Sequence, residues 1–229
     1  MPLTVWQPSD VLKEIKEMKK IAIIGAGGFG REVQMLIEQI NQEKKQYEFI
    51  GFFDDNEILN KKVINDFPVI GKIKDINNIR EELGIILAIG NTKLKKEIIN
   101  KINNPNIFFP TIIHPDVILG ERNVIEYGNI ITAGVILTTN IKIGKFNIIN
   151  LACTIGHDVI IKDFCSFMPS VNISGEVIIN NGVYIGTNAT IINQKKIGKW
   201  ATIGAGAVII KDVPDGVTVV GNPGRILDK

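Results

Sequence analysis

The chain has 229 residues, enough for one large or two small domains, and its 45% hydrophobic and 22% charged residues are ordinary for a globular protein. Its 26 basic and 24 acidic side chains are mixed along the chain and leave a net charge of +2, so we expect no nucleic-acid partner. The N-terminus lacks a cleavable apolar core and no uncharged run approaches the roughly 18 residues of a transmembrane helix, so we expect a cytoplasmic protein without a membrane partner.

Residues 1–20 are interpreted as an N-terminal extension. Within it, the segment SDVLKEIKEMKK predicts a short helix that Ser9 or Asp10 would cap.

Residues 21–110 predict a small Rossmann-like α/β domain. The segment KKIAIIGAGGFGREVQMLIEQI reads as a strand, a glycine-rich turn and a helix, and YEFIGFFDDN reads as a second strand that ends on acids. GIILAIGNTKLKKEIINKI repeats the order of strand, turn and helix. This alternation predicts an open unit with a parallel sheet.

The glycine-rich turn is the first candidate binding element. Gly25, Gly27 and Gly30 fit the pattern G-x-G-x-x-G between a strand and a helix, where backbone amides favour an anion such as a phosphate. Asp54 and Asp55 end the next strand and could accept hydrogen bonds from a ribose or a base, or cap the following turn. About 90 residues supply one mononucleotide-binding half, so a nucleotide or nucleotide-sugar is favoured over a dinucleotide. A tight turn without a ligand is the alternative.

Residues 111–214 repeat with a period of six. Of the seventeen positions at every sixth residue from Ile113 to Ile209, sixteen are Ile or Leu and the other is Phe167. A second series, four residues after each leading position, is dominated by small or β-branched residues that include Val117, Val135, Cys153, Val159, Cys165, Val171, Val177, Val183, Ala189, Ala201 and Ala207. This period predicts a parallel β-helix of hexapeptide repeats with both series pointing inward and with about 18 residues per coil.

Three further features follow from this repeat. The register is never broken, so we expect no long loop in the solenoid. Residues 215–229 are expected to cap its C-terminal end. Glycine recurs one position after the leading residue, where we expect it to turn the chain at positive φ. These glycines are Gly120, Gly144, Gly156, Gly186, Gly198 and Gly204.

The chain contains two cysteines. Cys153 and Cys165 form neither a CxxC pair nor a disulfide framework, which fits a reducing compartment. Both fall in the inward series, so we interpret them as small core residues rather than nucleophiles.

Taken together, several segments resemble a known family. They are IAIIGAGGFGRE, GFFDDN, PVIG, AIGNTKLKKEI, GHDVIIKDF, IGAGAVIIKDVP and VVGNPGRI. The chain is similar to the sugar O- or N-acyltransferases that include the bacillosamine-pathway and perosamine N-acetyltransferases and the sialic acid O-acetyltransferase group. The resemblance implies a left-handed β-helix after the α/β domain and a homotrimer. It also implies acetyl-CoA between neighbouring β-helices and a nucleotide-linked amino sugar held by the N-terminal domain.

The resemblance also implies a catalytic base. The family motif G-H-[DE] is Gly156-His157-Asp158 here, with His157 taking a proton from the attacking group and Asp158 holding the ring tautomer. An amine that attacks a thioester must lose a proton, which an imidazole can accept near neutrality. Adjacent strand residues point to opposite faces, so both side chains can serve one site only if the chain bends here, and Gly156 would allow that bend. A histidine at a subunit interface is the alternative. His114 is interpreted as structural.

Further positions are assigned to the two substrates. The nucleotide-linked sugar is assigned to the glycine-rich turn and the acids after the second strand, namely Gly25, Gly27, Gly28, Phe29, Asp54 and Asp55, and the resemblance adds Asn150, which could also form a turn. The turns IGTNATI and IGAGAVI match the path of the pantetheine arm, and they supply Gly186, Thr187, Gly204 and Ala205.

Two positions depart from the family pattern. Ser166 stands where many members have a histidine near the acetyl carbonyl, and its hydroxyl could donate to the thioester oxygen of acetyl-CoA. Phe29 stands where many amino-sugar enzymes have a histidine, which bears on which sugar is bound.

We predict a trimeric N-acetyltransferase that acts on a nucleotide-linked amino sugar for a bacterial surface glycan, by direct attack on acetyl-CoA with His157 as base. A sugar O-acetyltransferase acting on a sialic acid is the alternative, and a non-catalytic scaffold is a further one. A γ-type carbonic anhydrase is excluded because its zinc needs three histidines and the chain has two, so no metal is expected. Serine O-acetyltransferase is disfavoured because its helical N-terminal region does not resemble this α/β unit.

Overall fold

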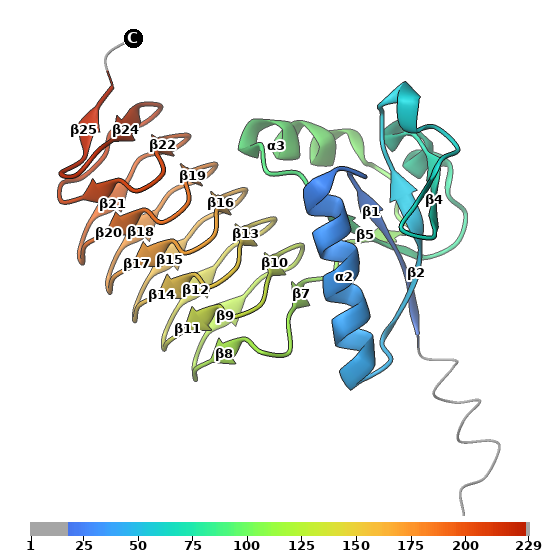
Figure 1. Ribbon diagram of the computed structural model, residues 1–229, viewed down its shortest axis with the longest axis horizontal. Helices are drawn as coiled ribbons and strands as arrows, with labels where there is room; N and C mark the ends of the chain where they lie inside the picture. Colours follow the sequence, from blue (N-terminus) through green and yellow to red (C-terminus); the bar gives the residue numbers. More distant parts are fainter. Residues whose placement is uncertain (1–17, 228–229) are drawn as a thin grey trace, which may run out of the picture.

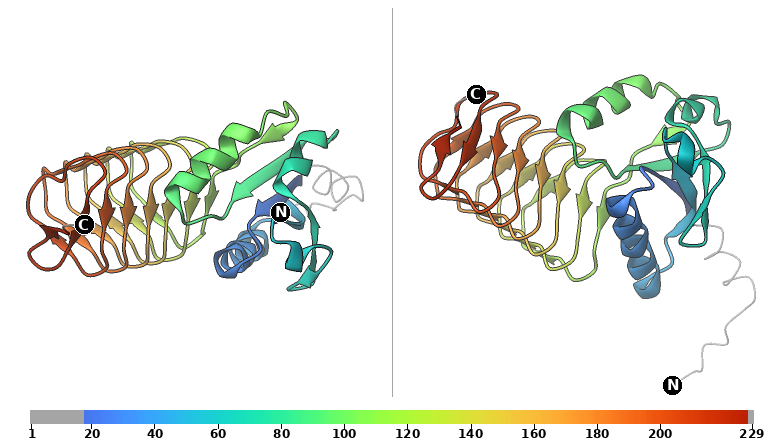
Figure 2. Two further views of the ribbon diagram at one scale, coloured as in Figure 1. Left: turned by 90° about the horizontal axis from the view of Figure 1, so that it is seen from above. Right: turned by 45° about the horizontal axis from the view of Figure 1, so that its top comes forward.

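The computed structural model describes residues 18–227, in which an α/β domain sits at one end of a β-helix (Figures 1 and 2). The predicted helix caps Ser9 and Asp10, with the rest of residues 1–17, lie outside the described residues. Lys19 and Lys20, which ended the expected extension, already belong to the first strand. Within residues 18–227, no helix has the length and hydrophobicity needed to span a bilayer.

The N-terminal domain is built on a six-stranded sheet with the order β3-β4-β2-β1-β5-β6. The strands are β1 (Lys19–Ile24), β2 (Tyr47–Phe53), β3 (Val63–Ile64), β4 (Phe67–Gly71), β5 (Leu83–Leu87) and β6 (Ile107–Phe108). The helices are α2 (Gly28–Glu43) and α3 (Thr92–Lys101), with 3-10 turns η1 (Glu57–Leu59) and η2 (Ile73–Asn78). All neighbouring strands pair in parallel except β3 and β4. The predicted parallel sheet is confirmed, with an antiparallel strand at one edge.

Both faces of this sheet are covered at its centre. The last four residues of β1 are fully buried, as expected for a parallel strand enclosed on two sides. One face packs against Val33, Leu36, Ile37 and Ile40 of α2, whose spacing places them on one side of that helix. The other face packs against Ile98 of α3.

The remaining strands form a left-handed parallel β-helix with three faces. Face 1 consists of β7 (Ile112–Ile113), β10 (Ile130–Ile131), β13 (Ile148–Ile149), β16 (Ser166–Phe167), β19 (Tyr184–Ile185), β22 (Thr202–Ile203), β24 (Thr218–Val220) and β25 (Arg225–Ile226). Face 2 consists of β8 (Ile118–Leu119), β11 (Ile136–Leu137), β14 (Thr154–Ile155), β17 (Asn172–Ile173), β20 (Thr190–Ile191) and β23 (Val208–Ile209). Face 3 consists of β9 (Val124–Ile125), β12 (Lys142–Ile143), β15 (Ile160–Ile161), β18 (Ile178–Ile179) and β21 (Lys196–Ile197).

Strands stack in register, one coil apart. Ile130 pairs with Ile148 and Ile136 pairs with Thr154, so the step between coils is 18 residues and no long loop interrupts it. Both predicted inward series form one continuous core, in which Cys153 and Cys165 are fully buried. Leu119, in the first coil, is the exception with 50% of its surface exposed, because the stack begins there.

The turns between faces correct one expectation about glycine. Corner 1 follows face 1, corner 2 follows face 2 and corner 3 follows face 3. The left-handed residue lies three positions after the leading residue and is usually not glycine, as at Asn140, Asp158 and Trp200. The glycines one position after the leading residue instead allow close stacking, since a Cβ on Gly186 would lie 2.5 Å from the Ala205 nitrogen in the next coil.

The α/β domain docks on face 1. Ile112, Ile130 and Ile148 point outward from this face and are buried in the same cluster as the α2 side chains. His114 is buried at this junction, where its Nε2 lies 3.0 Å from Oε1 of Gln39 and its Nδ1 accepts a hydrogen bond from the Asp116 amide. These contacts explain His114 as a structural residue. At the other end, the antiparallel pair β24 and β25 extends face 1 beyond β22.

Candidate active site

His157 and Asp158 lie together on corner 2, between β14 and β15. The His157 Nδ1 is 2.8 Å from the Asp158 Oδ2, so a proton on Nδ1 is donated to the carboxylate and Nε2 is left with a free lone pair. The side chains are 57% and 51% exposed. Such a ring can accept a proton from a bound group while the carboxylate stabilises the imidazolium.

The bend that brings these two side chains together is made by Asp158 rather than by Gly156. Asp158 has φ 59°, in the left-handed region, which turns its carboxylate back toward the preceding ring. Gly156 serves the stacking of coils, because a Cβ there would lie 2.7 Å from the Gly175 nitrogen. The expected bend exists, but the expected residue does not make it.

Gly175, one coil after His157, also belongs to this corner and is missed by the sequence reasoning. A Cβ on Gly175 would lie 2.5 Å from His157 Nε2 and 2.6 Å from its Cε1. The imidazole therefore covers Gly175, which is buried although it lies in a turn. A sequence signal existed, because Gly175 is the only glycine two positions after a leading residue of the six-residue repeat.

The glycine-rich turn lies between β1 and α2. Gly25 has φ 99°, and a Cβ on Gly30 would overlap the Gly25 carbonyl oxygen, so both glycines are required by the turn itself. Gly27 and Gly28 are exposed at the start of α2, and a Cβ on Gly27 would meet no atom of residues 18–227 within 4 Å. The surface beside Gly27 is therefore open, which is compatible with an anion at this helix N-terminus.

The two acids after β2 are engaged by the chain. Asp54 accepts hydrogen bonds from the Ala26 amide through Oδ2 and from the Asn56 amide through Oδ1, both at 2.8 Å. Asp55 accepts from the Ile73 amide at 2.9 Å. Asp54 therefore holds the glycine-rich turn to the end of β2, and capping accounts for both carboxylates. Phe29 is partly buried against the α2 cluster.

Asn150 and Ser166 lie away from corner 2. Asn150 is buried at corner 1, where its Oδ1 accepts hydrogen bonds from the Leu151 amide and the Thr132 hydroxyl. Ser166 lies on face 1 with no exposed surface, and its Oγ has no hydrogen-bond partner within residues 18–227. The expected contact of Ser166 with acetyl-CoA is not supported, because docking of the N-terminal domain covers this part of face 1.

The four residues predicted for the pantetheine arm all lie on corner 1. The amides of Gly186 and Gly204 donate to the Ile203 and Val219 carbonyls at 2.8 Å, so coil stacking uses them. Thr187 and Ala205 are exposed, and their amides have no hydrogen-bond acceptor within residues 18–227. These two amides are the ones that an extended ligand could engage along this corner.

One chain therefore presents three separate groups of predicted residues. The glycine-rich turn is in the α/β domain, while Thr187 lies on corner 1, after β19, and His157 on corner 2, after β14. Figure 1 shows these strands on the β-helix. Because corners 1 and 2 are separated by a full face of the solenoid, a single chain does not bring the pantetheine path and His157 together.

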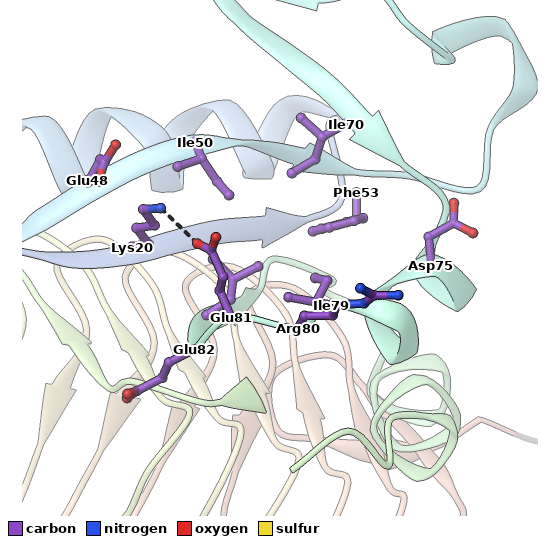
Figure 3. A pocket seen from close by; sticks show the side chains of 11 residues that line it. Lys20, Glu48, Ile50, Phe53, Ile70, Asp75, Ile79, Arg80, Glu81 and Glu82 are labelled. Carbon is purple, nitrogen blue, oxygen red and sulfur yellow. Dashed lines mark hydrogen bonds and ion pairs between the residues drawn. The ribbon is translucent and has the colours of Figure 1, made fainter. Parts of the chain in front are cut away.

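A groove of about 510 Å³ lies on the α/β domain, and none of the predicted catalytic or binding residues lines it (Figure 3). Ile50, Phe53 and Ile70 form its apolar floor, and Lys20 pairs with Glu81 at its rim at 2.9 Å. Phe53 belongs to the cluster on the side of the sheet away from α2.

Burial makes the two cysteines poor nucleophiles. It raises the pKa of the Cys153 thiol to about 12 and that of the Cys165 thiol to about 12, because neither thiolate would be solvated. Both thiols are unpaired and buried. A thiolate that would form an acyl-enzyme is therefore not supplied by either residue.

Similar proteins share this architecture. Residues 20–102 match the family described as the PglD N-terminal domain. The chain is 34% identical over 215 residues to the GDP-perosamine N-acetyltransferase of Escherichia coli O157:H7, covering 91% of this chain and 96% of that enzyme. The acetyltransferase domain of PglB from Neisseria gonorrhoeae FA1090, solved in complex with acetyl coenzyme A, has a TM-score of 0.83 at 33% identity, covering 92% of this chain and 100% of that one.

A further solved structure is PerB from Caulobacter crescentus in complex with CoA and GDP-perosamine. It has a TM-score of 0.80 at 25% identity and covers 91% of this chain and 97% of that one. Both the α/β domain and the β-helix are thus shared with these relatives over nearly their whole length. The chain accordingly belongs to the perosamine- and bacillosamine-type sugar N-acetyltransferases, a group of hexapeptide-repeat acetyltransferases.

Proposed function

We propose that the protein transfers the acetyl group of acetyl-CoA to the amino group of a nucleotide-linked amino sugar, with His157 as general base. The observation that carries this proposal is the exposed imidazole whose Nδ1 lies 2.8 Å from the Asp158 carboxylate, which leaves Nε2 to accept a proton. The complexes of PglB with acetyl coenzyme A and of PerB with CoA and GDP-perosamine support the two substrates.

The reaction is a direct transfer. The sugar nitrogen attacks the thioester carbonyl carbon, and its proton passes to His157 Nε2 while negative charge develops on the carbonyl oxygen. The carbon–sulfur bond then breaks, and the departing thiolate takes the proton from the imidazolium, which gives free CoA and the N-acetyl sugar. Asp158 stabilises the imidazolium between the two transfers. The raised pKa of both cysteine thiols supports a route without an acyl-enzyme.

The nucleotide is assigned to the glycine-rich turn. Gly27 and Gly28 expose amides at the start of α2, which would bind the diphosphate, and Gly25 shapes the turn. Phe29 borders this site. Asp54 and Asp55 hold the surrounding loops in place by accepting hydrogen bonds from backbone amides. Asn150 completes the proposed sugar contacts from corner 1.

We further propose that the enzyme works as a homotrimer in the cytoplasm. Corner 1, with Thr187 and Ala205, and corner 2, with His157, lie apart in one chain, so neighbouring copies would complete each site by placing corner 1 of one beside corner 2 of the next. The unpaired thiols suit a reducing compartment. The product would enter a bacterial surface glycan.

Release of free CoA in the presence of UDP-, GDP- and dTDP-linked amino sugars tests the reaction, with wild type and His157→Ala compared. We expect one nucleotide amino sugar to turn over and the variant to lose roughly 10²–10⁴-fold in kcat, the contribution of a general base. Turnover of a free sialic acid alone would contradict N-acetylation, and full activity of the variant would contradict the role of His157.

Shared sites have their own test. His157→Ala and Ala205→Trp damage corners 2 and 1 respectively, so each homo-oligomer should be inactive. Co-assembled chains should regain activity, because some sites then combine two intact corners. If the mixed oligomers are no more active than either variant alone, the site is not formed between copies.

A further inference from the structure

Gly175 has no conformational reason to be glycine. It lies two positions after the leading residue of its hexad, and the left-handed residue of that turn is the next one, Glu176, with φ 61°. Other coils of corner 2 carry side chains at this same position, namely Glu121, Thr139, His157, Asn193 and Lys211. The coil therefore accepts a side chain here, and something else requires its absence at residue 175.

The absent side chain makes room for an imidazole. The three heavy atoms nearest to a Cβ built on Gly175 are Nε2, Cε1 and Cδ2 of His157, at 2.5, 2.6 and 3.0 Å. Distances this short would force the ring to move. Because Gly175 is buried under the ring, one side of the imidazole packs on its backbone while the side chain as a whole stays 57% exposed.

The ring is held from two sides. Asp158 fixes Nδ1 at 2.8 Å, and Gly175 lies against the face of the ring beside Nε2 and Cε1. A carboxylate alone would let the ring rotate about the direction of that hydrogen bond. The second contact restricts this rotation and sets the direction of the Nε2 lone pair.

We infer that Gly175 is a positioning residue for His157, whose lack of a side chain seats the imidazole in its proton-accepting orientation. This inference rests on the proposed role of His157 as base. A methyl group at residue 175 would displace Nε2 by about an ångström, which is enough to cost roughly 10²-fold in rate when a reacting group must be aligned.

The variant Gly175→Ala tests this inference, with Asn193→Ala as a matched control at the same position one coil later. We expect Gly175→Ala to lower kcat roughly 10–10²-fold with little change in KM for acetyl-CoA, and Asn193→Ala to match wild type. In a His157→Ala background, Gly175→Ala should have no further effect, because it acts through the ring. A further loss of similar size in that background would overturn the inference.

Nitrogen-15 NMR of the free enzyme separates this inference from the proposed function. The chain has two histidines, so His157→Ala assigns the ring signals of His157. Gly175→Ala should shift the His157 ring resonances and leave those of His114 in place, whether or not His157 is the base. Unchanged His157 resonances in a folded Gly175→Ala protein would overturn the inference that Gly175 positions the ring. Full activity of His157→Ala would instead reject the proposed base while leaving the NMR result to stand.

Discussion

Lys95 of α3 donates a hydrogen bond of 2.9 Å from Nζ to the carbonyl oxygen of Phe146 in the β-helix. A second bond of 2.8 Å reaches the Cys165 carbonyl, and the whole side chain is buried. A lysine with no exposed surface, and with no carboxylate partner in the part of the chain that the structure describes, thus joins the two domains. Burial lowers the pKa of Lys95 from 10.5 to about 7.

This lysine should make stability depend on pH. Between pH 7 and 10.5 the unfolded chain holds a proton that the folded chain lacks, so the free energy of unfolding should rise with pH by roughly 1.4 kcal/mol per unit from this group. Lys95→Met should remove that rise and should cost about 1–3 kcal/mol at pH 8.5, where Phe146 loses its donor. Urea unfolding between pH 7 and 8.5 measures both effects.

Lys96→Met is the matched control for this experiment. Lys96 is the next residue of α3, is exposed and lies over the Trp200 ring at 5.4 Å. This variant should keep the wild-type dependence on pH. If the free energy of unfolding changes with pH in the same way for Lys95→Met and wild type, Lys95 is not neutral in the folded protein near pH 8.

The glycine-rich turn offers a pair of variants with opposite outcomes. Gly27→Ala adds a methyl group to open space above a helix N-terminus, so stability should change by less than about 0.5 kcal/mol. If the nucleotide diphosphate binds there, KM for the nucleotide sugar should rise about tenfold, which corresponds to roughly 1.4 kcal/mol of lost binding. KM for acetyl-CoA should not change.

Gly30→Ala is the counterpart in the same turn. Its methyl group would overlap the Gly25 carbonyl oxygen, so the thermal midpoint should fall markedly. Steady-state kinetics with each substrate and thermal unfolding of both variants measure the contrast. An unaltered KM for the nucleotide sugar in Gly27→Ala would contradict binding of the nucleotide at this turn.

The sequence predicts what depends on local repetition and misses what depends on docking. The six-residue repeat identifies the inward residues of each coil without any long-range information, so the core of the β-helix can be predicted directly. The site is less predictable. The bend at Asp158 occurs at a non-glycine residue, and the burial of Ser166 and Lys95 arises only when the α/β domain settles on the solenoid. No residue pattern within either domain encodes these contacts.

Asp158→Asn should separate the partner of His157 from the base itself. An amide at this position provides a weaker acceptor for the Nδ1 proton and does not neutralise the imidazolium. We expect kcat to fall roughly 10–10²-fold, less than at a buried carboxylate because Asp158 is half exposed. Glu176→Gln removes an exposed acid from the same turn position one coil later and should leave kcat unchanged. Equal effects of both variants would indicate general electrostatics instead of a specific partner.

Replacing both cysteines tests the direct transfer. Cys153→Ala with Cys165→Ala should retain kcat, because each thiol is fully buried and burial holds its pKa at about 12. The double variant should lose about 1 kcal/mol of stability per site, since each substitution leaves a small cavity in the coil core. A fall in kcat larger than the loss of folded protein explains would support a route through a cysteine acyl-enzyme.

The same thiols have a consequence at alkaline pH. Above pH 9 the unfolded thiols lose protons that the folded ones keep up to about pH 12, so each should lower the free energy of unfolding by roughly 1.4 kcal/mol per pH unit in that window. Removing both should therefore flatten the alkaline decline of wild type, which unfolding at pH 9, 9.5 and 10 would measure. An equally steep decline in the double variant would mean that other groups cause it, and that the buried thiols are more easily ionised in the folded protein than their surroundings imply.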